Sequence, residues 1–101
     1  MYRIEYSPDA RIDLRELAYT IANTYGMPQT SEKYVRELRA VIESLEHYPE
    51  RYPIRQNLSL QRYGINVRRV NYKKMAIIYS IVGFMVYIHR VMPSSMVIER
   101  F

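Results

Sequence analysis

The residues that could take part in chemistry lie mainly in the second half of the chain. Residues 51–101 contain nine Lys/Arg and one acidic residue, Glu99, for a net charge of +8. Residues 1–50 contain six Lys/Arg and nine Asp/Glu, for a net charge of −3. An uncompensated cationic half favours an anionic partner, either a nucleic acid or an acidic protein segment. A basic surface that is simply solvated would explain the same charges equally well.

Short basic clusters in this half could bind phosphate or move a proton. They are Arg68-Arg69, Lys73-Lys74 and His89-Arg90. Cleavage of RNA through its 2′-hydroxyl without a metal needs a base near that oxygen, a proton donor for the leaving oxygen, and fixed cations near the phosphate. The imidazole of His89 titrates near neutral pH and suits proton transfer. The simpler interpretation of His89, on an otherwise apolar strand, is a sheet-face residue.

The tyrosines offer a second way to bind a nucleic acid. Eleven tyrosines are present, and Tyr79 and Tyr87 are candidates to stack on unpaired bases beside the basic residues. The chain has no tryptophan and two phenylalanines, so tyrosine supplies most of its aromatic volume, and a core or interface role is favoured. Lys73 and Lys74 fall in a predicted turn, where a solvated hairpin is favoured over phosphate binding.

The sequence contains no pattern that predicts a cofactor. It has no cysteine, which excludes disulfides and thiolate chemistry, and its histidines are His47 and His89 alone. Neither a metal-ligand constellation nor a glycine-rich phosphate loop is found. We therefore expect no metal and no cofactor.

Local signals predict an N-terminal strand followed by two helices. Tyr2, Ile4 and Tyr6 alternate with polar residues, as in a half-buried strand. Ser7 before Pro8 then combines an N-cap with a proline at the first helical position. Gly26 and Pro28 end this helix, and a second amphipathic helix is expected from about 30 to 47.

Three strands are predicted after a basic loop at residues 50–63. Their ranges are 65–72, 75–82 and 84–92. The apolar run from Met75 to Ile88 is interrupted and shorter than the ~20 residues of a membrane helix, so it belongs in a sheet. We predict one α+β domain over residues 1–101: an N-terminal strand, an antiparallel two-helix hairpin and then a three-stranded antiparallel meander. The helices should pack on one face of the sheet. The second face is apolar too and should remain for a partner.

These elements resemble those of the RelE/ParE toxin superfamily of type II toxin-antitoxin systems, in the same order over most of the chain. The first helix carries an A-x-x-D-L pattern, the second ends in Tyr-Pro, and the strands follow an "RR…IxxY…VxIxRV" succession. The residues that carry the resemblance are Ala10, Asp13, Leu14, Leu17, Tyr34, Val35, Leu38, Ile42, Leu45, Tyr48, Pro49, Arg68, Arg69, Tyr79, Val86, Arg90 and Val91. Single motifs are common, and their order and spacing make the match persuasive.

The resemblance implies a toxin that an acidic antitoxin neutralises in the cytoplasm, with no membrane association. ParE-type relatives inhibit DNA gyrase, whereas RelE-type relatives cut messenger RNA in the ribosome without a metal. In the second case Arg68, Arg69 and Arg90 would be catalytic. Lys73, Lys74, Tyr79, Tyr87 and His89 would contact the target or antitoxin.

The end of the chain departs from the ribonuclease pattern. The ribonucleases continue after the last strand with paired arginines, but this chain has Pro93, Ser94, Ser95, Met96 and Val97. We therefore favour the ParE-like function. The ribonuclease, and a degenerate member that only binds its antitoxin, stay as alternatives. Neither the oligomeric state nor the role of the rest of the segment Pro93 to Phe101 follows from the sequence.

Overall fold

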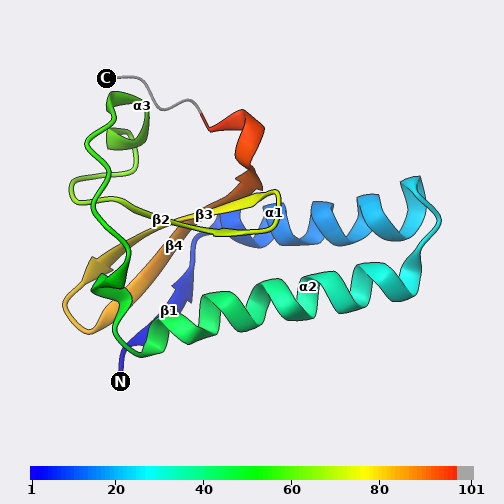
Figure 1. The fold of residues 1–101 in the computed structure, drawn as a ribbon, viewed down its shortest axis with the longest axis horizontal. Coiled ribbons are helices and arrows are strands. Elements are labelled where there is room, and N and C mark those ends of the chain that lie inside the picture. Colours follow the sequence, from blue (N-terminus) through cyan, green and yellow to red (C-terminus); the bar gives the residue numbers. More distant parts are fainter. Residues whose placement is uncertain (98–101) are drawn as a thin grey trace.

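A computed structural model describes residues 1–97 of the chain, which form one sheet and a long helical hairpin (Figure 1). The elements are β1 (Arg3–Tyr6), α1 (Pro8–Tyr19), α2 (Pro28–Glu43), α3 (Leu58–Gln61), β2 (Arg68–Tyr72), β3 (Met75–Val82) and β4 (Met85–Pro93). The α+β class and the order of strand, two helices and three strands are confirmed. Glu99 and the last part of the segment Pro93 to Phe101 lie outside the described residues.

The four strands form a sheet in the order β1-β4-β3-β2. Strands β2, β3 and β4 make the predicted antiparallel meander. Strand β1 pairs in parallel with β4, from Arg3 opposite Met85 to Tyr6 opposite Ile88. A parallel pair needs a long connection, and here it contains all the other elements of the fold. Because β1 ends at Tyr6, the last part of β4 has no neighbouring strand on that side within residues 1–97.

The start of α1 follows from two residues. The Ser7 hydroxyl accepts a hydrogen bond from the Ala10 backbone N–H at 2.9 Å, and Pro8 is the first helical residue. The same hydroxyl donates to the carbonyl of His89 at 2.7 Å, which ties the helix start to β4. At its other end, α1 continues into a π-helical turn, Thr20–Thr24, before Gly26 adopts a φ of 65°.

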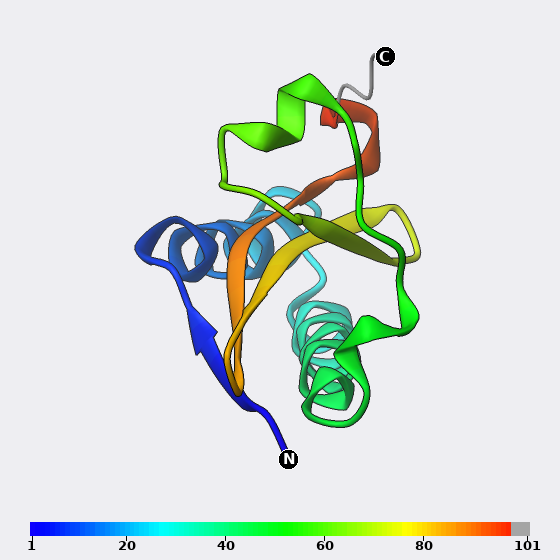
Figure 2. The same ribbon diagram turned by 90° about the vertical axis from the view of Figure 1, so that its left-hand side faces the viewer.

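The two helices form an antiparallel hairpin on one face of the sheet (Figures 1 and 2). Helix α2 begins at Pro28, slightly earlier than predicted, and a 3-10 turn, Ser44–Glu46, follows it. The core on this face contains Ala10, Leu14, Leu38, Ile42, Leu45, Val70, Met75, Ile77, Tyr79, Val86, Ile88 and Val91. The part of the hairpin that lies beyond the sheet leaves Tyr19, Tyr25 and Met27 exposed. No helix within residues 1–97 has the length and apolar character needed to span a bilayer.

The second face of the sheet is covered by the chain itself, contrary to our expectation. Leu60 of α3 and Val67 pack against Ala76 and Ile78 of β3, and Val97 joins them. The segment predicted as a loop at residues 50–63 therefore contains helical turns that bury apolar side chains. Residues 75 to 80 of β3 are all buried, because the strand packs against the core on both faces of the sheet. In the part of the chain that the structure describes, both faces at the centre of the sheet are therefore covered.

Candidate functional site

Two tyrosines and a serine of the second face lie around His89. Its Nε2 lies 2.8 Å from the Ser80 Oγ, so the two share a hydrogen bond. The rings of Tyr63 and Tyr87 lie 5.6 and 5.1 Å from the imidazole, measured between centroids. Tyr63 comes from the turn after α3, and the other three come from β3 and β4. We call Tyr63, Ser80, Tyr87 and His89 the His89 cluster.

Burial determines the charge of this cluster. Because His89 is half-buried, desolvation lowers its pKa below the ordinary value of 6.5, and the imidazole is neutral near pH 7. A neutral imidazole beside a hydroxyl can accept its proton. Ser80, however, is only 7% exposed, and within residues 1–97 no carboxylate is hydrogen-bonded to His89. The pair therefore lacks both the access and the orienting acid of an activated nucleophile.

The pairing of β4 with β3 is irregular at His89, next to Arg90. Ile78 pairs with Arg90 and Tyr79 pairs with Ile88, so His89 is an extra residue in the ladder. The side chain of Arg90 reaches α1, where its Nε and Nη2 donate to the two carboxylate oxygens of Asp13 at 2.7 and 2.9 Å. These hydrogen bonds to Asp13 raise the pKa of Arg90 further above its ordinary value. Arg90 is bound within the fold.

Asp13 also binds the backbone near the end of β4. Its Oδ2 also accepts a hydrogen bond from the Val91 backbone N–H at 2.9 Å. This N–H lies beyond the last residue of β4 that pairs with β1, where the strand edge would otherwise be unpaired. The Asp13 carboxylate therefore accepts the hydrogen bond that a neighbouring strand would otherwise accept, and it also binds Arg90. We did not predict this role, although Asp13 stands in the A-x-x-D-L pattern of the first helix.

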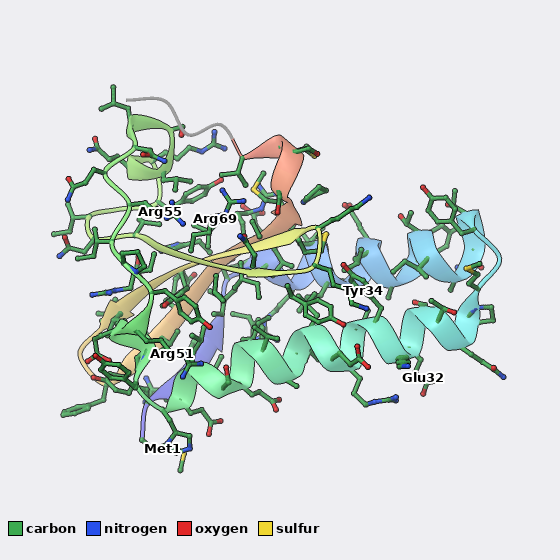
Figure 3. The ribbon with its side chains drawn as sticks, in the orientation of Figure 1. Met1, Glu32, Tyr34, Arg51, Arg55 and Arg69 are labelled. Atoms are coloured by element: carbon green, nitrogen blue, oxygen red, sulfur yellow. The ribbon has the colours of Figure 1, made fainter. Side chains whose placement is uncertain are left out.

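Arg68 and Arg69 lie on opposite faces of β2, as their adjacent positions require. The Nη1 of Arg68 donates to the carbonyl oxygens of Glu50 and Tyr52 at 3.0 and 2.6 Å, which holds the turn after α2 against the sheet. The Nε of Arg69 donates to Asn71 Oδ1 at 2.9 Å, and Figure 3 shows Arg69 beside Arg55 on the side of the sheet away from α2. The three predicted catalytic arginines thus do not converge on one point.

The remaining predicted binding residues have different environments. Tyr79 is fully buried, and its hydroxyl donates to the Pro49 carbonyl at 2.7 Å; burial raises its pKa to about 12. A binding role does not fit this position. Lys73 lies in the β2–β3 turn, as predicted, with Nζ 5.5 and 5.4 Å from the ring centroids of Tyr34 and Tyr72. Lys74 follows it and is exposed.

The fold and the site define a small α+β domain in which two of the predicted catalytic arginines, Arg68 and Arg90, link separate elements of the fold. A family model described as the ParE toxin of the type II toxin-antitoxin system, parDE, matches residues 4–98. The chain therefore belongs to the ParE toxin family, and the resemblance to the RelE/ParE superfamily is confirmed.

A solved structure supports the fold. The structure described as the chromosomal ParDE TA system from P. aeruginosa is similar with a TM-score of 0.69 and 15% identity, over 92% of this chain and 96% of that chain. None of the curated proteins compared with the sequence matches it.

Proposed function

We propose that this chain is a toxin that acts by protein contact on DNA gyrase or a similar target, and that a cognate acidic antitoxin neutralises it. Membership of the ParE toxin family supports the toxin role. The observation that favours action by protein contact over RNA cleavage is that Arg68 and Arg90 are hydrogen-bonded within the fold. We also propose that the protein acts in the cytoplasm, where such targets are found.

Metal-free RNA cleavage depends on cations that face the scissile phosphate. Loss of one donor at a developing oxyanion typically reduces the rate by about 10²-fold or more. Freeing Arg90 for a phosphate would leave the Asp13 carboxylate without its guanidinium partner, and freeing Arg68 would break its hydrogen bonds to two carbonyls. The described part of the segment after β4, Ser94 to Val97, supplies no cation in exchange.

One observation favours the ribonuclease as the second candidate. His89 is neutral near pH 7 and shares its face of the sheet with Arg69, Tyr63 and Tyr87. A base, a cation and two aromatic rings on one face are among the parts that RNA cleavage would need. The His89 cluster is therefore the place where this activity would be found.

Two assays test the proposal: a gyrase assay with the purified chain, and primer extension on messenger RNA from cells in which the chain is induced. We expect the purified chain to inhibit DNA supercoiling by gyrase, and His89→Ala and Arg69→Ala to retain this inhibition. Primer extension should show no translation-dependent cuts within codons. Cuts that disappear in both variants would instead establish the ribonuclease. Failure of both assays, with antitoxin binding intact, would identify the degenerate member.

A further inference from the structure

The hairpin tip, which we define as residues 19–30, lies within the longest charge-free run of the chain. No Asp, Glu, Lys, Arg or His occurs from Leu17 to Ser31, although 25% of all residues are Asp, Glu, Lys or Arg. The next longest such run, from Met75 to Ile88, supplies the core of the sheet. The tip differs from it in burial, because every residue from 23 to 30 is exposed.

The hairpin tip projects beyond the sheet. In Figure 1 it is the end of the hairpin farthest from the N-terminus, and the strands do not reach it. Tyr19, Tyr25 and Met27 are 67%, 69% and 52% exposed there. The tip also contains the π-helical turn Thr20–Thr24, and such turns are frequent at functional sites. Charged residues are depleted, and tyrosine and methionine enriched, at the centres of protein interfaces, so the composition of the tip is that of a contact surface.

Hydrogen bonds within the hairpin hold the tip in one conformation. The Met27 backbone N–H donates to the Ile21 carbonyl at 3.1 Å across Gly26, whose φ of 65° is the left-handed conformation that ends many helices. The buried Ser31 hydroxyl donates to the Ala18 carbonyl at 2.7 Å, which joins the start of α2 to the end of α1. Because the tip is ordered before binding, its side chains contact a partner with little further loss of conformational entropy.

The absence of charge limits the kind of partner that the tip fits. A nucleic acid or an acidic protein segment is attracted by Lys and Arg, and the tip has neither. Two copies that meet tip to tip would bury only their ends, whereas stable complexes bury about 800 Å² on each partner. An uncharged crevice in a larger protein fits both the projecting shape and the composition, since it covers the tip on several sides.

We propose that the hairpin tip is the contact surface for the target of this toxin, and that Tyr19, Tyr25 and Met27 enter an uncharged, apolar crevice of that protein. Tyrosine is frequent among the residues that contribute most to binding, and methionine adapts its shape to irregular pockets. The proposal rests on the proposed function, because it names the part of the chain that contacts the target of that function. Sequence reasoning had placed target contacts at basic residues, since a charge-free run indicates a partner only once its exposure is known.

Inhibition of gyrase supercoiling by the purified full chain measures the contribution of the tip. We expect Tyr25→Ser/Met27→Ser to raise the concentration needed for half-inhibition by at least about tenfold. The control, Val82→Ser/Phe84→Ser, removes a similarly exposed pair from the β3–β4 turn, far from the tip in Figure 1. It should stay within about twofold of the unaltered chain. Circular dichroism confirms the folding of each variant.

A charge placed on the tip tests the uncharged character of the crevice. Thr24→Glu introduces a carboxylate at an exposed position that would lose its water on binding, so we expect a loss of inhibition comparable to that of Tyr25→Ser/Met27→Ser. Thr24→Gln has nearly the same size as Thr24→Glu and no charge, and it should inhibit nearly as well as the unaltered chain. Equal inhibition by Thr24→Glu and the unaltered chain would overturn the proposal, because an unpaired carboxylate is costly in an apolar crevice.

A growth assay without antitoxin separates failure of this proposal from failure of the proposed function. If the unaltered chain inhibits gyrase and the tip variants inhibit it equally well, the tip proposal is overturned while the proposed function stands. If the unaltered chain stops growth without inhibiting gyrase, the target is another protein. Weaker toxicity of the tip variants then supports the tip as its contact surface, and undiminished toxicity overturns it. If the unaltered chain affects neither gyrase nor growth, both proposals fail.

Two other partners of the tip remain to be excluded. The Tyr25→Ser/Met27→Ser variant should bind the protein encoded by the neighbouring open reading frame with an unchanged Kd, and it should sediment at equilibrium like the unaltered chain. Loss of that binding would overturn the proposal and make the tip an antitoxin surface. A dimer that the variant dissociates would overturn it as well and make the tip a self-association surface.

Discussion

The two faces of the sheet are covered in different ways. On the helix face, long apolar side chains of α1 and α2 meet those of β3 and β4, and Leu38 and Ile42 are fully buried. On the second face, a short segment around α3 contributes Leu60 and Val67, and the polar His89 cluster lies beside them. One face thus supplies most of the stability, while the other retains titratable groups near the surface.

Truncation of a core residue on each face should separate their contributions most clearly. Ile42→Ala removes a fully buried side chain from α2, and we expect the free energy of unfolding to fall by about 2–5 kcal/mol. The loss for Leu60→Ala should lie at or below the lower end of that range, because the four-residue α3 can move to close the space. Urea denaturation followed by circular dichroism measures both. Equal losses would contradict the comparison.

Breaking the contact between α1 and β4 should give the second-largest loss of stability. Asp13→Asn keeps the shape but removes the charge that binds Arg90, and we expect a loss of about 1.5–3 kcal/mol. Part of this value is screened, because the Arg90 side chain is 26% exposed. The control is Glu5→Gln in the exposed Arg3–Glu5 pair, which should change stability by less than about 1 kcal/mol. A similar effect of both changes would show that Asp13 has no special role.

A hydroxyl deletion on each face should produce a smaller difference. Tyr79→Phe leaves the Pro49 carbonyl without its donor in the core, and we expect a loss of about 1 kcal/mol. Tyr87→Phe removes a hydroxyl from a partly exposed ring and should have almost no effect on unfolding. If Tyr87→Phe proves the more costly change, the second face holds a hydrogen bond that matters for stability.

The smallest expected effect is the contribution of His89, on the second face, to the pH dependence of stability. His89 has a lower pKa in the folded chain than in the unfolded chain, so below about pH 6.5 the unfolded state binds more protons. Stability should therefore fall as the pH drops through 6.5 toward the folded pKa, and level off below it. His89→Phe should flatten this part of the profile. An unchanged slope in His89→Phe would assign the dependence to another group.

Local signals in the sequence were sufficient to predict most elements. Ser7 and Pro8 indicated the start of α1, and the apolar run between Lys73-Lys74 and Gly83 located β3, because caps and turn residues depend on near neighbours. The bond between Asp13 and Arg90 joins residues 77 positions apart, and no local pattern encodes it. The extra residue at His89 also depends on pairing with β3. For the same reason, the cover of the second face by α3 was missed.

The parallel pairing of β1 with β4 has a consequence for synthesis. Ribosomes make β1 and α1 before β4, yet the residues opposite β1 in the sheet are 85 to 88, and the hydrogen-bonding partners of Asp13 are residues 90 and 91. Pairings so distant in sequence form late and slowly. The nascent chain therefore cannot complete its sheet until β4 leaves the ribosome exit tunnel. Cotranslational folding of the sheet is therefore deferred until β4 has been made, although β1 and α1 are made before it.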